Sequence, residues 1–459
     1  MMMLLVTLLL GCRGGDATDA PDGTASDASP SDTFDSAPPF TPSPALRFTG
    51  DPPRNVLMIS IDTLRADHVL PGSVFDGAPN LQRWQTEGVY TTDAMQCANW
   101  TYASTSCTLL GRDPIEHGFL PRLPDELERP YPDGEAFLAT VFQEAGFRTA
   151  ISSRNGFLGP RTNNIQGYDD ALTNLRPAQT QLAGMMEHLR QGDDGSPFFA
   201  HVHMIEPHDP YDAPEEYEVG RDALDPVRWD FADGSDVNDL RVNSDELEPE
   251  ELALAQAHAR IVYEAEVRWI DDQIEAGLQA WRDRGLLDDT LVVFWSDHGE
   301  QLWEHGRYTH AYDLHYGENQ ALFSLWAVGL EPVRWDGPVS LQDLAPTVLQ
   351  AMGLDTPPQM TGFPLGEAPP DRLRRAVTAD REPQNAMRRE ELKLVFQWDT
   401  SARLLYDRVA DPEETTNVFD ADNPRHAALW EDLVPYIQTT DAMLPGETVD
   451  WAAVGGAAP

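Results

Sequence analysis

Two acidic residues that stand at the ends of largely apolar segments are the first candidates for chemistry. Residues 291–295 are all large and apolar and lead to Asp297 and His298, and residues 55–61 end at Asp62. Such runs indicate strands buried in a parallel sheet, and ligands bind beyond the carboxyl ends of these strands. Carboxylates and a neutral imidazole suit a divalent cation. We therefore predict one metal site at Asp62, Asp297 and His298, although Asp297 taken alone would also suit a helix N-cap.

A segment rich in hydroxyl groups is the second candidate. Residues 97–105 carry Thr101 and Ser104 and lead into a helix that we expect from about residue 106, closed by residues 111–114. The backbone N–H groups at a helix start favour an anion, so a hydroxyl group there could meet an anionic substrate. The alternative is a cluster of N-capping side chains.

Histidines follow two of the expected strands. His208 lies in the loop after the strand expected at residues 198–204, between two prolines that rigidify the loop and could aim the imidazole inward. The loop after His298 carries Glu304, Arg307 and three further histidines, His305, His310 and His315. Exposed histidines are often only solvated, so the spacing by itself assigns none of them a role.

The elements that must position these residues are those of an α/β fold. Further strands are expected at 147–152 and 322–328, helices at 137–145 and 339–352, and a hairpin at 394–397 and 404–406. Residues 222–251 are acidic and lack periodicity, which favours a surface insertion or a lid. An apolar stripe predicts an amphipathic helix that packs on the sheet without a catalytic role. Its members are Tyr263, Val267, Ile270, Ile274, Leu278 and Trp281.

The charge of the chain restricts its partners. Its 459 residues include 32 Lys and Arg against 77 Asp and Glu, a formal net charge of −45. Such a surface repels phosphate backbones, which excludes nucleic-acid binding. An anionic substrate would need local positive charge from a metal ion and a few basic side chains.

The amino terminus predicts export. Residues 1–12 are an apolar run that is too short to span a bilayer and ends at Gly11 and Cys12. This ending resembles a bacterial lipoprotein signal with lipidation at Cys12, although no Lys or Arg precedes the run; an ordinary cleaved signal is the alternative. Residues 13–50 are expected to be a disordered linker. Cys97 and Cys107 could form a disulfide in an oxidising compartment or remain as buried thiols.

Taken together, the segments resemble the sulfatase family of the alkaline phosphatase superfamily. The matching segments are residues 55–68, 100–118, 207–211, 296–300 with 305–306, 343–347, and 405–407 with 411–417. The resemblance implies an alkaline phosphatase-like sulfatase fold, with a large, mostly parallel central sheet flanked by helices and a small C-terminal α+β subdomain. The expected boundaries are 51–365 for the catalytic domain, 366–444 for the subdomain and 445–459 for a loose tail.

The resemblance also implies roles for individual residues. Asp62, Asp297 and His298 would ligate one divalent cation (Ca²⁺, Mg²⁺, Mn²⁺ or Zn²⁺, with Ca²⁺ favoured for a sulfatase), with Thr101 beside it as a further ligand and the nucleophile. His208 and His310 would contact the transferred group or the leaving oxygen. The expected substrate contacts are Arg65, Ser104 and His298.

The chain departs from the family pattern at two places. The sequence Thr101-Tyr102-Ala103-Ser104-Thr105 replaces the Cys/Ser-x-Pro-x-Arg motif, so no formylglycine is expected, and Thr63 stands where many sulfatases have a second metal-binding Asp. Threonine nucleophiles occur in relatives that act on phosphodiesters and phosphonates. The expected activity is therefore hydrolysis of a sulfate ester, or of a phosphate diester or phosphonate monoester. The alternative is a non-catalytic protein that binds an anionic glycan or another partner in the same cleft.

Overall fold

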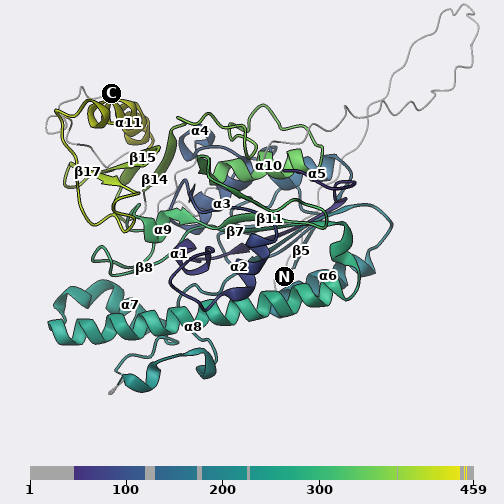
Figure 1. Cartoon of the computed structure of the whole chain (residues 1–459), viewed down its shortest axis with the longest axis horizontal. Helices are drawn as coiled ribbons and strands as arrows, with labels where there is room; N and C mark the ends of the chain where they lie inside the picture. Colours follow the sequence, from purple (N-terminus) through teal and green to yellow (C-terminus); the bar gives the residue numbers. More distant parts are fainter. Residues whose placement is uncertain are drawn as a thin grey trace, which may run out of the picture. The chain divides into compact units, whose positions relative to one another are not determined.

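The structure, a computed structural model, describes residues 46–118, 130–172, 178–224, 228–379, 381–444, 449 and 451 (Figure 1). The expected signal segment, with Cys12, and nearly all of the expected linker lie outside these residues. Among the described helices, none combines the length and the apolar character needed to cross a membrane.

An eight-stranded sheet forms the centre of the fold, in the order β12-β2-β11-β7-β1-β6-β4-β5. The middle strand β1 (Asn55–Ile61) pairs in parallel with both β7 (Thr290–Ser296) and β6 (Phe198–Met204). The register aligns Ile61 with Ser296, so Asp62 and Asp297 leave the same edge of the sheet side by side. The remaining strands are β2 (Val89–Thr91), β4 (Arg148–Ser152), β5 (Asp170–Leu172), β11 (Phe323–Trp326) and β12 (Val333–Trp335). Only β11 runs antiparallel to its neighbours, so the mostly parallel sheet is confirmed.

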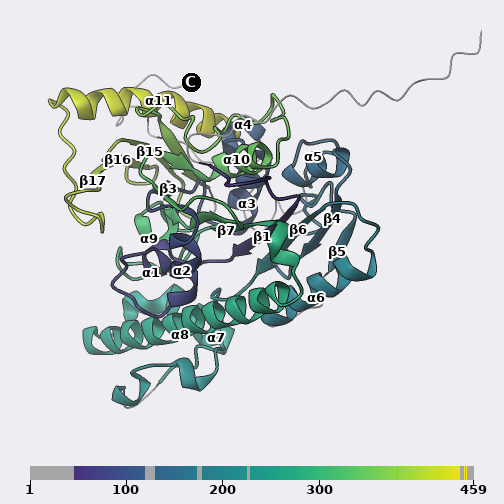
Figure 2. The same ribbon diagram turned by 45° about the vertical axis from the view of Figure 1, so that its right-hand side comes forward.

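Helices cover both faces of the sheet, because alternate residues of the buried strands present apolar side chains to each side. One face packs on α2 (Pro79–Thr86), α6 (Ala178–Gln191) and α8 (Pro249–Arg282), and the other on α3 (Thr101–Leu110), α5 (Leu138–Glu144) and α10 (Leu344–Ala351) (Figures 1 and 2). The predicted stripe is confirmed, since all six of its members are buried in the first of these layers.

Shorter elements connect these layers. They are α1 (Ala66–Val69), β3 (Ala94–Met95), α4 (Pro114–His117), α7 (Gly234–Asn243), β8 (Gln301–Leu302), β9 (Tyr308–Thr309), α9 (Tyr316–Asn319), β10 (Gln320–Ala321) and β13 (Val339–Ser340).

A four-stranded antiparallel sheet and one helix form the C-terminal part. The strands are β14 (Arg374–Thr378), β15 (Gln384–Arg389), β16 (Leu392–Gln397) and β17 (Ala402–Asp407), and the helix is α11 (Pro424–Met443). The predicted hairpin is β16 with β17. The expectation of a loose tail is wrong at Val449 and Trp451, which pack into this subdomain's core, where the indole of Trp451 donates to Asp441 (3.0 Å).

Three other predicted elements differ from the structure. Helix α3 begins at Thr101 rather than near residue 106. The hydroxyl groups of Ser104, Thr105 and Thr108 donate hydrogen bonds to backbone carbonyls one turn earlier, so these polar side chains are compatible with a helix. The acidic stretch at 222–251 contains helix α7. The helix expected at 339–352 begins only at α10, after β13 and a 3₁₀ turn.

Candidate functional site

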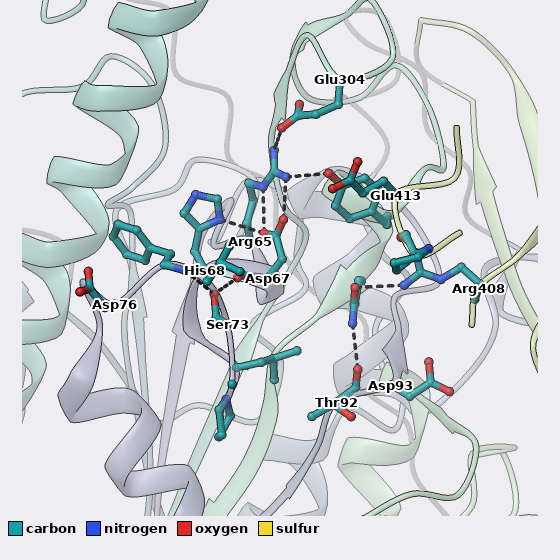
Figure 3. Close-up of a pocket in the computed structure, with 18 of the residues that line it drawn as sticks. Arg65, Asp67, His68, Ser73, Asp76, Thr92, Asp93, Glu304, Arg408 and Glu413 are labelled. Carbon is teal, nitrogen blue, oxygen red and sulfur yellow. Dashed lines mark hydrogen bonds and ion pairs between the residues drawn. The ribbon is translucent and has the colours of Figure 1, made fainter. Parts of the chain in front are cut away.

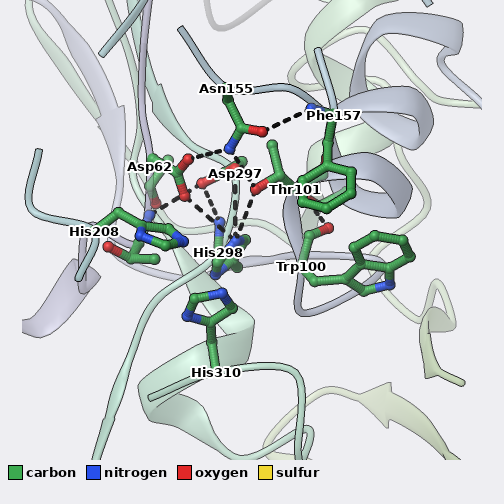
Figure 4. Close-up of polar contacts among 12 residues, drawn as sticks. Asp62, Trp100, Thr101, Asn155, Phe157, His208, Asp297, His298 and His310 are labelled. Atoms are coloured by element: carbon green, nitrogen blue, oxygen red, sulfur yellow. Dashed lines mark hydrogen bonds and ion pairs between the residues drawn. The ribbon is translucent and has the colours of Figure 1, made fainter. Parts of the chain in front are cut away.

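The three predicted metal ligands meet at the carboxyl edge of the sheet. Asp62, Asp297 and His298 each offer a ligand atom within 4.8 Å of the others, and all three side chains are fully buried (Figure 4). Asp62 Oδ1 and Asp297 Oδ2 each lie 3.6 Å from His298 Nε2. The parallel register of β1 and β7 therefore produces the convergence expected from the sequence.

The hydrogen bonds around the cluster leave one atom of each ligand for a cation. Asp297 Oδ1 accepts from the backbone N–H groups of Thr63 (3.2 Å) and His298 (2.9 Å), whereas Asp297 Oδ2 and Asp62 Oδ1 have no hydrogen-bond partner among the described residues. His298 Nδ1 donates to the Gly299 carbonyl (2.9 Å), which leaves the lone pair of Nε2 for a metal. Buried carboxylate oxygens without partners are costly, so this donor set fits a divalent cation.

The electrostatics of the cluster agree with this interpretation. Burial raises the pKa of Asp297, and the nearby charge of Asp62 raises it further. Burial also acts to raise the pKa of Asp62, but the charge of His208 and a hydrogen bond from His203 outweigh it and hold that pKa well below its usual value. Burial lowers the pKa of His298 to about 4, so the imidazole is neutral at pH 7, as a metal ligand must be.

Thr101 lies at the first position of α3, beside the cluster. Its Oγ1 is 3.5 Å from His298 Nε2, and the first backbone N–H groups of a helix have no acceptor within the helix. A disulfide joins Cys97, four residues before Thr101, to Cys107, six residues after it. Of the two alternatives for these cysteines, a disulfide or free buried thiols, the structure therefore has the disulfide. The covalent link fixes the start of the helix relative to the segment that enters it.

Asn155 is a site residue that the sequence reasoning missed. Its Nδ2 donates to Asp62 Oδ2 (2.6 Å) and to Thr101 Oγ1 (3.0 Å), so one amide bridges a predicted metal ligand and the predicted nucleophile (Figure 4). The backbone N–H of Phe157 donates to Asn155 Oδ1 (2.8 Å) and thereby fixes the orientation of the amide. Its position in the loop just after β4, at the same sheet edge, was the available signal.

His208 and His310 lie together at the solvent side of the cluster. Their ring centres are 4.8 Å apart, and the ring of His310 is 4.6 Å from that of His298. Both side chains are partly exposed, whereas the metal ligands are not. His310 Nδ1 bonds to the buried carboxyl of Glu300 (2.9 Å) and His208 Nδ1 to the Asp209 carbonyl, which leaves each Nε2 for other contacts.

Two predicted substrate contacts, Arg65 and Ser104, have other partners in the structure. The buried guanidinium of Arg65 pairs with Asp67 (2.8 Å) and Glu304 (2.7 Å), on the wall of a separate cavity of about 1060 Å³ that none of the metal ligands lines (Figure 3). Ser104 Oγ donates to the Trp100 carbonyl (2.8 Å) inside α3. Local acids pair with the arginine and the helix backbone accepts from the serine, and the substrate contacts expected of both residues stay predictions.

A tyrosine of the apolar stripe supports the metal loop. Tyr263 OH donates to the Thr63 carbonyl (2.8 Å) and accepts from the Arg65 N–H (2.9 Å), and Thr63 has a positive φ of 51°. A β-branched residue in the left-handed region is strained, so these bonds help to hold the turn that follows Asp62. The stripe is therefore not purely a packing surface.

The remaining histidines of the loop, His305 and His315, contact the C-terminal subdomain instead of the cluster. Their rings stack with centres 3.8 Å apart. His305 Nε2 donates to the Glu413 carbonyl (3.0 Å), and His315 Nε2 forms a hydrogen bond with Tyr406 OH (3.0 Å). The backbone N–H of Tyr316 also donates to Glu414 (3.0 Å). These contacts tie the loop that carries His310 to the small subdomain.

Comparison with known proteins identifies relatives along most of the chain. Residues 54–354 match the family model described as Sulfatase. An arylsulfatase from Clostridium perfringens is 23% identical over 390 residues, which cover 68% of this chain and 77% of that protein. Among solved structures, a 2-O GAG sulfatase matches with a TM-score of 0.66 and 15% identity, covering 89% of this chain and 97% of the other. A phosphonate monoester hydrolase from Silicibacter pomeroyi matches with a TM-score of 0.63 and 19% identity, covering 85% and 95%.

Proposed function

Because this chain belongs to the sulfatase family, a family of hydrolases of sulfuric and phosphoric esters, we propose that it cleaves an anionic ester with Thr101 as nucleophile and one divalent cation as cofactor. The observation that carries the proposal is the position of Thr101 Oγ1, 3.0 Å from Asn155 Nδ2 and 3.5 Å from His298 Nε2. A hydroxyl group beside a buried set of metal ligands and two partly exposed imidazoles has the components of a nucleophilic ester hydrolase.

The residues would divide the reaction as follows. A cation held by Asp62, Asp297 and His298 would polarise the ester and lower the pKa of the attacking hydroxyl. Asn155 donates to Thr101 Oγ1, which orients the oxygen for attack at sulfur or phosphorus. As Thr101 Oγ1 bonds to sulfur or phosphorus, its proton passes to water, the bond to the leaving oxygen breaks, and His208 supplies a proton to that oxygen. Burial holds the pKa of His310 well below its usual value, so this imidazole would contact the transferred group in its neutral form. Water then hydrolyses the threonyl ester and restores the hydroxyl group.

The threonine favours a phosphate diester or phosphonate monoester over a sulfate ester as substrate. Support comes from the absence of a cysteine or serine at position 101, since formylglycine cannot form there, and from the structural likeness to phosphonate monoester hydrolases. A sulfate ester is the second candidate, favoured by the family match and by the arylsulfatase relative. Either substrate is an anion, which the cation at this edge would attract to a strongly acidic protein.

A substrate panel tests the proposal directly. Chromogenic sulfate monoesters, phosphate monoesters and diesters, and phosphonate monoesters are assayed with Ca²⁺, Mg²⁺, Mn²⁺ or Zn²⁺. We expect turnover of at least one ester, its loss on chelation, and a fall of several orders of magnitude in Thr101→Ala. Thr108→Ala is the matched control, because Thr108 is a buried threonine two turns further along α3 whose hydroxyl donates to the Ser104 carbonyl (2.8 Å).

The outcomes separate the competing interpretations. Turnover by Thr101→Ala equal to that of the wild type would eliminate the threonine as nucleophile. If no ester turns over with any cation, the protein is better described as a binding protein for an anionic glycan or another anionic partner. Mass spectrometry of a quenched reaction should find the transferred group on the peptide that contains Thr101.

We also propose that the protein is an exported bacterial lipoprotein, tethered to a membrane through a lipid at Cys12. The support is the apolar run of residues 1–10 followed by Gly11 and Cys12, and the polar composition of the segment that follows. Mass spectrometry of the mature amino terminus tests this proposal, because a chain that begins beyond Cys12 would rule out the anchor.

A further inference from the structure

Polar side chains cross the apolar core beneath the metal cluster. Ser60 on β1 and His201 and His203 on β6 are all 0% exposed, and Ser60 pairs with His203 in the sheet register. Their neighbours on the same face include Phe199 and Trp295. Burial of polar groups among such residues is unfavourable unless each group is hydrogen-bonded, so the arrangement of their partners is informative.

The side chains form a continuous chain of hydrogen bonds that ends on a metal ligand. Tyr168 OH lies 2.9 Å from His201 Nδ1, and His201 Nε2 lies 2.8 Å from Ser60 Oγ. Ser60 Oγ lies 2.8 Å from His203 Nδ1, and His203 Nε2 lies 3.3 Å from Asp62 Oδ2. The half-buried Tyr168 is the outer end of the chain, and Asp62 is the inner end.

The chemistry of the groups gives this chain a direction. A carboxylate oxygen can only accept, so His203 Nε2–H donates to Asp62. When His203 Nδ1 accepts from the Ser60 hydroxyl, Ser60 Oγ accepts from His201 Nε2–H. Burial lowers the pKa of His201, so its ring is neutral and its Nδ1 accepts from Tyr168 OH. In this arrangement each of the four groups donates one hydrogen bond, and every donor points toward Asp62.

The chain determines which oxygen of Asp62 is available to a cation. Oδ2 accepts from both His203 and Asn155, whereas Oδ1 has no hydrogen-bond partner among the described residues and lies 3.6 Å from His298 Nε2. Rotation of the carboxylate would break both bonds to Oδ2. The side of Asp62 that faces the cluster is thus set by donors outside the cluster.

We propose that Tyr168, His201, Ser60 and His203 are positioning residues that act as one directional hydrogen-bond chain and hold Asp62 with Oδ1 toward the cation. This inference rests on the proposed metal-dependent function and deepens it, because it assigns the control of metal affinity to residues that touch neither metal nor substrate. Hydrogen bonds in a chain polarise one another, so removal of an inner link weakens the last one. Loss of an outer partner of a metal ligand typically weakens metal binding roughly 10- to 100-fold.

Calorimetric titration of the apoprotein with Mn²⁺ and with Ca²⁺ tests the chain without any assay of activity. In Ser60→Ala, His203 Nδ1 loses its donor and the ring can adopt the tautomer whose Nε2 cannot donate to Asp62. We expect Kd to rise at least about 10-fold. Ser324→Ala is the matched control, because Ser324 lies buried on β11 of the same sheet and its hydroxyl has no hydrogen-bond partner among the described residues. An equal Kd for Ser60→Ala and the wild type would overturn the inference.

A second pair of variants separates the hydrogen bond from the shape of the side chain. His203→Gln keeps an N–H donor within reach of Asp62, and we expect its Kd to stay within a few-fold of the wild type, whereas His203→Leu should lose at least about 10-fold. Equal losses in both variants would mean that packing, not donation, matters. Nitrogen-15 NMR of histidine-labelled protein should find His201 and His203 protonated at Nε2 only, and a proton on His203 Nδ1 would overturn the direction.

These outcomes also separate this inference from the proposed function. If the wild type binds a cation and Ser60→Ala binds it equally well, only the positioning chain fails. If the wild type binds no divalent cation, both the metal-dependent function and the proposed role of the hydrogen-bond chain are refuted. If the affinity depends on Ser60 but Thr101→Ala retains full turnover, the chain stands and the nucleophile assignment fails.

Discussion

Removal of the disulfide that encloses Thr101 should cost a defined amount of stability. Cys97 and Cys107 are separated by 10 positions, and the loop-entropy relation for a ring of that size gives about 2.7 kcal/mol at 25 °C. With an unfolding entropy of roughly 2.1 cal/mol/K per residue over 459 residues, this corresponds to a decrease of about 3 °C in Tm. Both half-cystines are fully buried, so each substitution also has a local packing cost that must be separated from the loss of the link.

A double-mutant cycle makes that separation. Cys97→Ala and Cys107→Ala each lose the link together with one local packing contribution, whereas the double variant loses the link once and both packing contributions. The free energy of unfolding is measured for each variant by guanidinium denaturation without reductant. The sum of the losses in the two single variants should exceed the loss in the double variant by about 2.7 kcal/mol. In reductant the excess should disappear. Additivity within about 0.5 kcal/mol under oxidising conditions would refute the reasoning.

Three further predictions follow from the site and from one buried acid. Asn155→Ala removes the donor shared by Thr101 and Asp62, so kcat should fall roughly 10- to 100-fold on the best ester while Tm changes little. An unchanged kcat would exclude its role. Asp297→Asn relieves the repulsion between two buried carboxylates, so the apoprotein should melt at a higher temperature than the wild type. A cation at 100 times its Kd should stabilise the wild type by about 2.7 kcal/mol, and thermal scans of Asp297→Asn should show no such stabilisation. Burial raises the pKa of Glu266 to about 8, from 4.5 in the unfolded chain, so the contribution of this group to the free energy of unfolding is complete below pH 4.5 and is lost as the pH rises through 8. Between these pH values the free energy of unfolding should fall by at most about 1.4 kcal/mol per pH unit. Denaturation curves of Glu266→Gln should lack this pH-dependent decrease.

The elements that carry the metal ligands were predictable because their sequences are nearly unambiguous. Residues 56–59 and 291–295 are apolar throughout, and the parallel pairing of neighbouring strands brings Asp62 and Asp297 to one edge. The small C-terminal hairpin was also visible as two short apolar runs. These inferences depend only on local periodicity and on the polarity of strands, both of which the sequence contains.

Other parts of the site depend on distant partners that a sequence does not reveal. Arg65 looked like an anion-binding residue because the pairing of its guanidinium with Glu304 exists only in three dimensions. Tyr263 was indistinguishable from its apolar neighbours in the stripe, since only its hydroxyl group contacts the turn at Thr63. Asn155 has neither charge nor periodicity to mark it, and only the general rule for the ends of parallel strands could have drawn attention to it.

The contacts of His305 and His315 with the small subdomain mean that the two parts of the chain are not interchangeable modules. A chain shortened before residue 366 would lack the Glu413 carbonyl, the Glu414 carboxylate and the Tyr406 hydroxyl that anchor the loop carrying His310. Shortening the protein would therefore release the loop that carries His310 without changing the register of the strands that present Asp62 and Asp297. Exchange of C-terminal segments between related enzymes should succeed only when the anchoring histidines are exchanged with them.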